Sequence, residues 1–162
     1  MSIPFVDTVR RNHALEHATI SLLRRRLPPE THVSGRSTVS GFYLYGDIPG
    51  GLVEQSAREA LVLLQQGQSH LAISEQCGTN LAVSGIVTGL AALMAVGRGR
   101  RLDRLPQALL VAVMASMLGR PLGAWVQRRL TTYAQVGGLA ISSVERRRRG
   151  PLTVHMVRTS GG

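Results

Sequence analysis

The chain has 162 residues and a formal charge of +10, with 19 basic residues against 9 acidic ones, and every basic residue is an arginine. This length is typical of one domain with its own core, and a hydrophobic content of 44% excludes a disordered chain. The single cysteine excludes an intramolecular disulfide framework and favours a reducing compartment. The excess of positive charge indicates an anionic partner, which leaves lipid head groups, nucleic acid and acidic proteins to be weighed.

The first predicted element is an amphipathic helix that follows Asp7. Positions 9, 13, 16, 20, 23 and 27 recur at alternating spacings of four and three, which is the pattern of one helix face. Asp7 is expected to cap this helix, because an acidic side chain is favourable at a helix N-terminus. Pro28–Pro29 is expected to end it.

The next segment predicts a small sheet and a second helix. Thr38–Tyr45 is rich in β-branched and aromatic residues and predicts a strand, with a short partner strand at Thr31–Ser34. Leu52–Gln66 has the apolar spacing of an amphipathic helix that ends at Gly67. Leu71–Ser74 predicts a further short strand.

The middle of the chain is almost free of charge. Leu81–Gly97 has no charged residue in 17 positions, and Leu105–Gly119 has none in 15, before an interruption at Arg120–Pro121. We interpret these stretches as a helical hairpin that enters the bilayer; the alternative is a buried helical pair in a soluble core. Trp125 is suited to an interfacial anchor, and the G-x-x-x-G spacing of Gly85 and Gly89 would allow close helix contact within the hairpin or between subunits.

The C-terminal region predicts a β-hairpin. Gly138–Val144 and Leu152–Arg158 have the composition and alternation of strands, and Glu145–Pro151 would form an arginine-rich tip between them. The expected fold class is therefore α+β: a small sheet with two amphipathic helices, interrupted by an inserted transmembrane helical hairpin. Residues 1–79 and 131–162 would build one α+β domain, and residues 80–130 would form the membrane hairpin.

One motif carries recognisable chemistry. His13-Ala14-Leu15-Glu16-His17 is an H-x-x-E-H sequence on a predicted helix, and residues four apart lie on the same helix face. His13 and His17 could therefore bind one metal ion, and Glu16 could take a proton from metal-bound water. Asn12 could supply a supporting hydrogen bond. The alternative is an internal Glu–His pair, or a half-exposed helix face, without metal.

This motif resembles the inverted zinc motif of the inverzincin metallopeptidases, which implies His13 and His17 as zinc ligands and Glu16 as general base. The inverzincins take their third ligand from a glutamate on a later helix, whereas Glu54 and Glu59 are expected on the polar face of their helix here. Donor chemistry favours the segment from His70 to Cys77 instead. Cys77 is the first choice, since thiolate joins imidazole readily on zinc, followed by His70 and Glu75; an ordinary buried cysteine is the alternative.

A second resemblance covers most of the chain. The segments Asn12–Ile20, Gly41–Gly46 and Cys77–Asn80, followed by the apolar hairpin, resemble a family of small uncharacterised bacterial membrane proteins. The resemblance implies an integral membrane protein in which the histidine segment and the Cys-Gly-Thr-Asn segment share one scaffold. It implies no activity.

The distribution of the arginines favours lipid over nucleic acid. The sequence has no recognised nucleic-acid motif, and 4% aromatic residues are too few for a stacking platform. Arginines that flank apolar stretches fit contact with anionic lipid head groups. The four arginines of the hairpin loop favour a cytoplasmic loop by the positive-inside rule. We nevertheless expect cytoplasmic soluble parts, because no leader precedes the N-terminal helix.

Two functions follow as hypotheses. The first is a membrane-bound, zinc-dependent hydrolase, most plausibly peptidase-like, in which His13, His17 and a third ligand hold the metal and Glu16 acts as base. The second is a non-catalytic integral membrane subunit or assembly factor that packs against a partner protein or a second copy of the chain.

Overall fold

The computed structural model describes residues 4–74, 77–97, 102–149 and 152–161. The contacts within the chain divide it into two units. The first unit comprises Met1–Ser74 together with Thr131–Gly162, and the second unit is the intervening segment Glu75–Leu130. Glu75, the third choice for a metal ligand, lies outside the described residues.

Helix α1 (Pro4–Arg26) opens the first unit. It begins before Asp7, so the expected cap at that residue is wrong: Asp7 lies in the first turn and pairs with Arg10 at 3.3 Å. The helix ends where Pro28–Pro29 predicts, since proline restricts the residue before it. Its middle is buried nearly all round, which the predicted amphipathic pattern did not anticipate.

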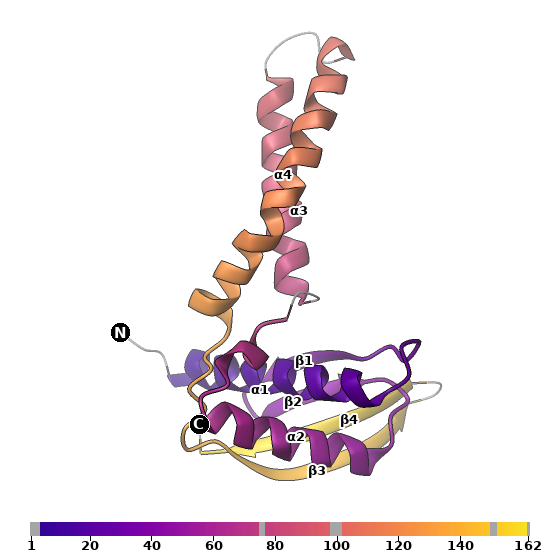
Figure 1. Cartoon of the computed structure of the whole chain (residues 1–162), viewed down its shortest axis with the longest axis vertical. Helices are drawn as coiled ribbons and strands as arrows, with labels where there is room; N and C mark the ends of the chain where they lie inside the picture. The colour runs from indigo at the N-terminus through magenta and orange to yellow at the C-terminus, as the bar shows by residue number, and fades with distance from the viewer. Residues whose placement is uncertain (1–3, 75–76, 98–101, 150–151, 162) are drawn as a thin grey trace. The chain divides into compact units, whose positions relative to one another are not determined.

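The first unit contains a four-stranded antiparallel sheet in the order β1-β2-β4-β3. Its strands are β1 (Ser34–Thr38), β2 (Gly41–Tyr45), β3 (Ala140–Arg149) and β4 (Leu152–Ser160). Helix α1 contacts β1 and β2, and helix α2 (Gly50–Gln65) contacts β3 and β4. Both helices cover the same face of the sheet (Figure 1). The core between them contains Leu15 and Leu23 of α1, Phe42 and Leu44 of β2, and Val53 of α2.

Three predicted strands of the N-terminal half differ from the structure. The partner of β2 is β1, Ser34–Thr38, and not Thr31–Ser34. Thr38–Tyr45 is not one strand, because Val39 and Ser40 form the turn between β1 and β2. Gly41 resumes the chain with φ of 131°, and a Cβ there would collide with the carbonyl oxygen of Val157. Leu71–Ser74 is not a strand either, since Ser69–Ala72 forms the short 3₁₀ helix η1. A four-residue apolar run fits either element when it is buried on one side.

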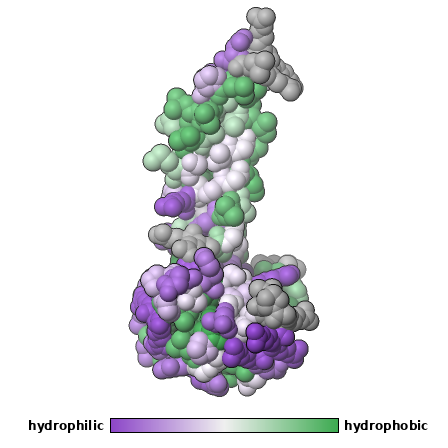
Figure 2. All heavy atoms as spheres, turned by 90° about the vertical axis from the view of Figure 1, so that its right-hand side faces the viewer, coloured by the Kyte–Doolittle hydropathy of each residue, from purple (hydrophilic) through white to green (hydrophobic). Residues whose placement is uncertain are grey.

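The second unit contains two antiparallel helices, α3 (Gly78–Val96) and α4 (Leu105–Val126). The 3₁₀ helix η2 (Leu102–Arg104) precedes α4, and the π-helix η3 (Gln127–Thr131) follows it. Both long helices are long and apolar enough to cross a membrane by length and composition. Only 6% of the apolar window of the first and 17% of that of the second is buried, and Figure 2 shows many hydrophobic residues on the face of this hairpin that is in view. Helix α4 continues through Arg120 and Pro121, where the uncharged stretch is interrupted, and ends at Val126.

Small residues of α4 line the seam of the hairpin. A Cβ at Gly119 would collide with Ser84, and one at Gly123 would collide with Asn80. The buried amide of Gln127 donates to Oδ1 of Asn80 at 2.7 Å, which closes the same end of the hairpin. By contrast, a Cβ at Gly85 or Gly89 would meet nothing within 4 Å, so the expected role of these two glycines within the hairpin is wrong. The close approach is made by the G-x-x-x-G of Gly119 and Gly123.

The observed fold is thus a mixed α+β arrangement. A small antiparallel sheet with two helices on one face forms the first unit, and its sequence is interrupted by a helical hairpin. The predicted C-terminal β-hairpin is confirmed, with both strands longer than expected: β3 runs through the arginines as far as Arg149.

Candidate metal centre

Two histidines of α1 form the candidate centre. His13 and His17 lie one turn apart, and their ring centroids are 4.3 Å apart with the planes inclined at 62°. His17 is 4% exposed, and His13 is half-buried. The spacing of four residues therefore brings the two imidazoles into direct contact on one helix face, as the motif predicts.

Each imidazole is oriented by a backbone carbonyl of another segment. Nδ1 of His13 lies 2.9 Å from the carbonyl oxygen of Thr131, and Nδ1 of His17 lies 2.8 Å from that of Ala72. A carbonyl oxygen only accepts hydrogen bonds, so each Nδ1 carries a proton and donates it. In the neutral form of each ring the lone pair then belongs to Nε2. This carbonyl-to-Nδ1 arrangement is the one that orients histidines for metal binding through Nε2.

The carboxylate of Glu16 is held by the first hairpin of the sheet. Glu16 is 4% exposed, and the hydroxyl of Ser37 in β1 donates a short hydrogen bond to its Oε2. Gly35 of the same strand makes room for this carboxylate, because a Cβ there would lie 2.7 Å from Cδ of Glu16 and would collide with Oε1. A carboxylate has about four acceptor positions, so the bond from Ser37 uses only part of its capacity.

Asn12 has a different role from the expected support of the histidines. It is fully buried, and its amide nitrogen donates to the carbonyls of Thr38 at 2.9 Å and Val39 at 3.2 Å. Its Oδ1 accepts from the hydroxyl of Thr159 at 2.7 Å. Asn12 therefore fastens α1 to the β1–β2 turn and to the end of β4, and the prediction that it assists the metal ligands is replaced by this structural role.

The candidates for a third ligand come from different segments of the chain, and His13, His17 and Cys77 form a group that could hold a metal ion. His70 is exposed on η1 in the first unit. Cys77 belongs to the second unit, where it caps the N-terminus of α3 and its Sγ accepts from the backbone N–H of Thr79 at 3.4 Å. Glu54 and Glu59 lie on the polar side of α2, as expected, and pair with Arg58 and Arg26.

The remaining two histidines, His32 and His155, were not predicted to bind metal. His32 is exposed, whereas His155 of β4 is fully buried on the helix-facing side of the sheet, beside Leu44 in the strand register. Burial lowers the pKa of His155, and the charge of Arg146 lowers it further, while the backbone of Ile48 and the carboxylate of Asp47 act in the opposite direction. We find no hydrogen-bond partner within normal geometry for either ring nitrogen, so the Ile48 contact is a weak one.

Four residues that shape the centre were not predicted from the sequence. Ala72 and Thr131 act through backbone carbonyls, which no side-chain pattern reveals. Ser37 and Gly35 alternate along β1, so they lie on one face of that strand. This alternation was the available signal, but it required knowing which strand packs against α1.

Residues 8–144 match a family described as Domain of unknown function (DUF6391), so the chain belongs to this family. An uncharacterised protein of Picosynechococcus sp. (strain ATCC 27264 / PCC 7002 / PR-6) is 32% identical over 150 residues, which cover 85% of this chain and 71% of that relative. No solved structure matches the chain. The predicted membership of an uncharacterised family is thereby confirmed.

Proposed function

We propose that this protein is a membrane-bound, metal-dependent hydrolase whose metal ion is held by His13 and His17. The observation that carries the proposal is the pair of Nδ1–H donations to backbone carbonyls, because it presets both rings for binding through Nε2. Two imidazoles in contact one helical turn apart supply two ligands at little cost in ordering.

We propose Cys77 as the third ligand. His13, His17 and Cys77 offer two imidazole nitrogens and one thiolate, a donor set that could hold a metal ion. Zinc suits this set, since three protein ligands leave a fourth position for water. Cys77 follows Ala72, whose carbonyl orients His17, by five residues, so the chain that orients one ligand also carries the next. His70 is the competing third ligand within the same segment.

In the proposed reaction Glu16 is the general base. The metal ion would supply Lewis acidity that activates a water molecule. The oxygen of that water bonds to a peptide carbonyl carbon, the C–N bond breaks, and Glu16 carries the proton from water to the leaving nitrogen. Ser37 would keep the carboxylate in place during this transfer through its hydrogen bond to Oε2.

The hydrogen bond from Ser37 to Glu16 is also compatible with a second proposed function, that of a non-catalytic membrane subunit or assembly factor. Glu16 is buried over Gly35 and accepts from Ser37, and such an arrangement would also satisfy a carboxylate that only ties α1 to β1. In that case the histidines would be structural or would bind metal without turnover, and the hairpin would pack against a partner protein or a second copy of the chain.

For location, we propose that α3 and α4 span the membrane and that the first unit lies at its cytoplasmic surface. The support is the exposure of large apolar side chains along both helices, for example Leu93 at 70%, Met94 at 82% and Met117 at 73%. In water such a surface would be costly, whereas lipid tails cover it without loss. Exposed arginines such as Arg147 and Arg148 suit anionic lipid head groups, and nucleic acid is not among the proposed partners.

Metal analysis of the full chain in mild detergent tests the proposal. We expect about one metal ion per chain in the wild type, a loss of metal in His13→Ala and His17→Ala, and no loss in His32→Ala, which changes an exposed histidine. Glu16→Gln should keep the metal but lose hydrolysis of a fluorogenic casein substrate. A wild type without bound metal would exclude the hydrolase. Bound metal without any hydrolysis that depends on Glu16 would favour the non-catalytic function.

Two further variants separate the third ligands. Cys77→Ser should weaken metal binding by at least about tenfold, since a hydroxyl is a poor substitute for a thiolate on zinc. His70→Ala should leave binding unchanged. The reverse result would assign His70 as the ligand. Membrane fractionation checks the location: extraction by high salt alone, without detergent, would contradict a spanning hairpin.

A further inference from the structure

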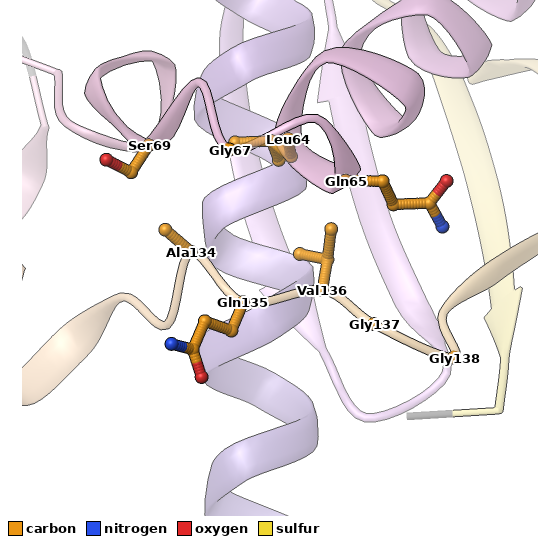
Figure 3. Close-up of a pocket in the computed structure, with 9 residues that line it drawn as sticks. All are labelled: Leu64, Gln65, Gly67, Ser69, Ala134, Gln135, Val136, Gly137 and Gly138. Atoms are coloured by element: carbon orange, nitrogen blue, oxygen red, sulfur yellow. The ribbon is translucent and has the colours of Figure 1, made fainter.

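A pocket of about 590 Å³ lies in the first unit beside the segments that orient the histidines. One wall is the end of α2 and the turn into η1, from Leu64 to Ser69, and the other is the segment from Ala134 to Gly138, which ends in a turn. Figure 3 shows these two segments facing each other, with the side chains of Leu64 and Val136 directed toward the gap between them. The volume falls within the usual range of ligand sites.

Both walls continue directly into the histidine contacts. Ser69 of the pocket lies three residues before Ala72, whose carbonyl accepts from His17. Ala134 lies three residues after Thr131, whose carbonyl accepts from His13. An extended chain spans at most about 3.6 Å per residue, so Ser69 lies within about 11 Å of Ala72, and Ala134 lies within about 11 Å of Thr131. The nearest residue of each wall is therefore close to a carbonyl that orients an imidazole.

The second wall is also fixed to α1. The backbone N–H of Tyr133 donates to the carbonyl of Arg10 at 3.1 Å, and the guanidinium groups of Arg10 and Arg11 lie 5.6 and 5.5 Å from the centre of the Tyr133 ring. The pocket thus has one wall tied to the helix that bears His13 and His17, on the turn before His13. A ligand in the pocket would be held in a constant position relative to the two histidines.

The lining selects an uncharged ligand. No ionisable side chain lines the pocket among the described residues, so a charged group placed there would lose hydration without gaining a counter-charge. Leu64, Ala134 and Val136 supply apolar surface, and the amides of Gln65 and Gln135 lie beside it. Oε1 of Gln135 accepts from the hydroxyl of Tyr133 at 2.9 Å, which orients its NH₂ group as a donor. One N–H of Gln65 donates to the carbonyl of Leu139 at 3.3 Å. The remaining amide donors of Gln65 and Gln135 beside a small apolar surface match a polypeptide segment.

We propose that this pocket is the substrate-binding subsite of the centre and that it binds an extended, uncharged peptide segment with a small apolar side chain. The assignment as a substrate subsite rests on the proposed hydrolase, whereas peptide binding itself does not require metal. Gly137 provides a direct way to close the pocket: a Cβ there would meet nothing within 4 Å, and its backbone is outside the left-handed region. Since Gly137 lines the pocket, a large side chain there has space to occupy part of it.

The test is fluorescence anisotropy of the full chain in mild detergent with a dansylated peptide, Gly-Ala-Val-Ala-Gly amide. The wild type should bind it, and Gly137→Phe and, from the opposite wall, Ser69→Trp should each bind it at least about tenfold more weakly. Gly51→Phe is the matched control, because Gly51 is exposed on α2 and a Cβ there also meets nothing within 4 Å. A peptide with aspartate in place of the valine should bind at least about tenfold more weakly to the wild type.

Metal and peptide measurements separate the two proposals. His13→Ala should lose the metal and retain the peptide, whereas Gly137→Phe should retain the metal and lose the peptide. Absence of peptide binding in the wild type, or equal binding by both pocket variants and the wild type, would overturn the subsite even if the protein binds metal. Peptide binding that responds to the pocket variants supports a peptide-binding site there even if hydrolysis is absent.

Discussion

Replacing Gly35 by alanine should reveal how tightly the carboxylate of Glu16 is held. In the wild type, the new Cβ would lie 2.7 Å from Cδ and 2.8 Å from Cγ of Glu16 and would also collide with Oε1. Carbon atoms ordinarily approach to about 3.5 Å, so the overlap is roughly 0.7–0.8 Å. Overpacking of this kind costs about 1–3 kcal/mol. Displacing a buried carboxylate from its donor, the hydroxyl of Ser37, adds about 1–3 kcal/mol.

In a Glu16→Ala background the same substitution should be harmless. The three atoms that the new Cβ would meet are then absent, and Gly35 does not have a positive φ. Replacing a strand glycine at a compatible backbone should then stabilise the protein by about 0.4–1 kcal/mol, because the unfolded chain loses freedom. The double-mutant cycle should therefore show a coupling of at least about 2 kcal/mol between the two positions.

The assay is urea unfolding of the full chain in mild detergent. The three tyrosines, Tyr43, Tyr45 and Tyr133, all belong to the first unit, whereas Trp125 belongs to the second. In a Trp125→Phe background, tyrosine fluorescence therefore reports on the first unit alone.

Gly51→Ala is the matched control for the Gly35 substitution, since a Cβ at position 51 meets nothing, and it should not destabilise the protein. If Gly35→Ala destabilises the Glu16→Ala protein as much as it destabilises the wild type, the reasoning is refuted. Glycine at position 35 would then not be needed to make room for the Glu16 carboxylate.

Three other substitutions test separate parts of the structure. Asn12→Ala should cost about 2–4 kcal/mol in the same unfolding assay, because two carbonyls and a hydroxyl lose a buried partner; a loss under about 1 kcal/mol would contradict this role. The lowered pKa of His155 means that its neutral ring is favoured in the fold, so stability should be complete above the ordinary histidine pKa of about 6.5 and should decline below it as the pH falls toward the folded-state pKa. His155→Leu should reduce that decline, and an unchanged pH profile would exclude His155 as its source. Gly123→Leu should lower the thermal stability of the helical hairpin, measured by circular dichroism, since its Cβ would collide with Asn80. Gly89→Leu is the control, because a Cβ there meets nothing within 4 Å. Equal effects of the two substitutions would refute the close helix contact at Gly123.

Much of the architecture followed from local patterns. Periodicity and the positions of proline and glycine were sufficient to predict four features. These are the end of α1 before Pro28–Pro29, helix α2, the uncharged hairpin and the C-terminal strands. The division of Thr38–Tyr45 by a turn was missed, although Ser40-Gly41 is a dipeptide typical of turns, because the β-branched and aromatic residues on both sides favoured one continuous strand. Leu71–Ser74 was assigned as a strand because a short apolar run has no period of its own.

The candidate site was predictable only as far as side chains carry the information. The contact between His13 and His17 follows from their spacing alone. The carbonyls of Ala72 and Thr131 could not be predicted, because they come from residues 55 and 118 positions away from their histidines and act through the backbone. Asn12 immediately precedes His13 in the sequence, yet its side chain is directed to the sheet. Consecutive residues of a helix point in different directions, so the position next to the motif did not predict a contact with it.

The bond between Asn80 and Gln127 also bears on the order of folding. The sheet pairs β2 with β4, so strands on either side of a 56-residue insertion, Glu75–Leu130, must meet before the first unit is complete. Once the two helices are antiparallel and this bond has formed, the connection from Ser74 to Thr131 behaves as a loop of about 10 residues rather than about 57. By the logarithmic dependence of loop entropy on length, this lowers the closure cost by about 1.5 kcal/mol. A preformed hairpin therefore reduces the loss of chain entropy when β2 pairs with β4. We expect the inserted segment to fold before the sheet that it interrupts is complete.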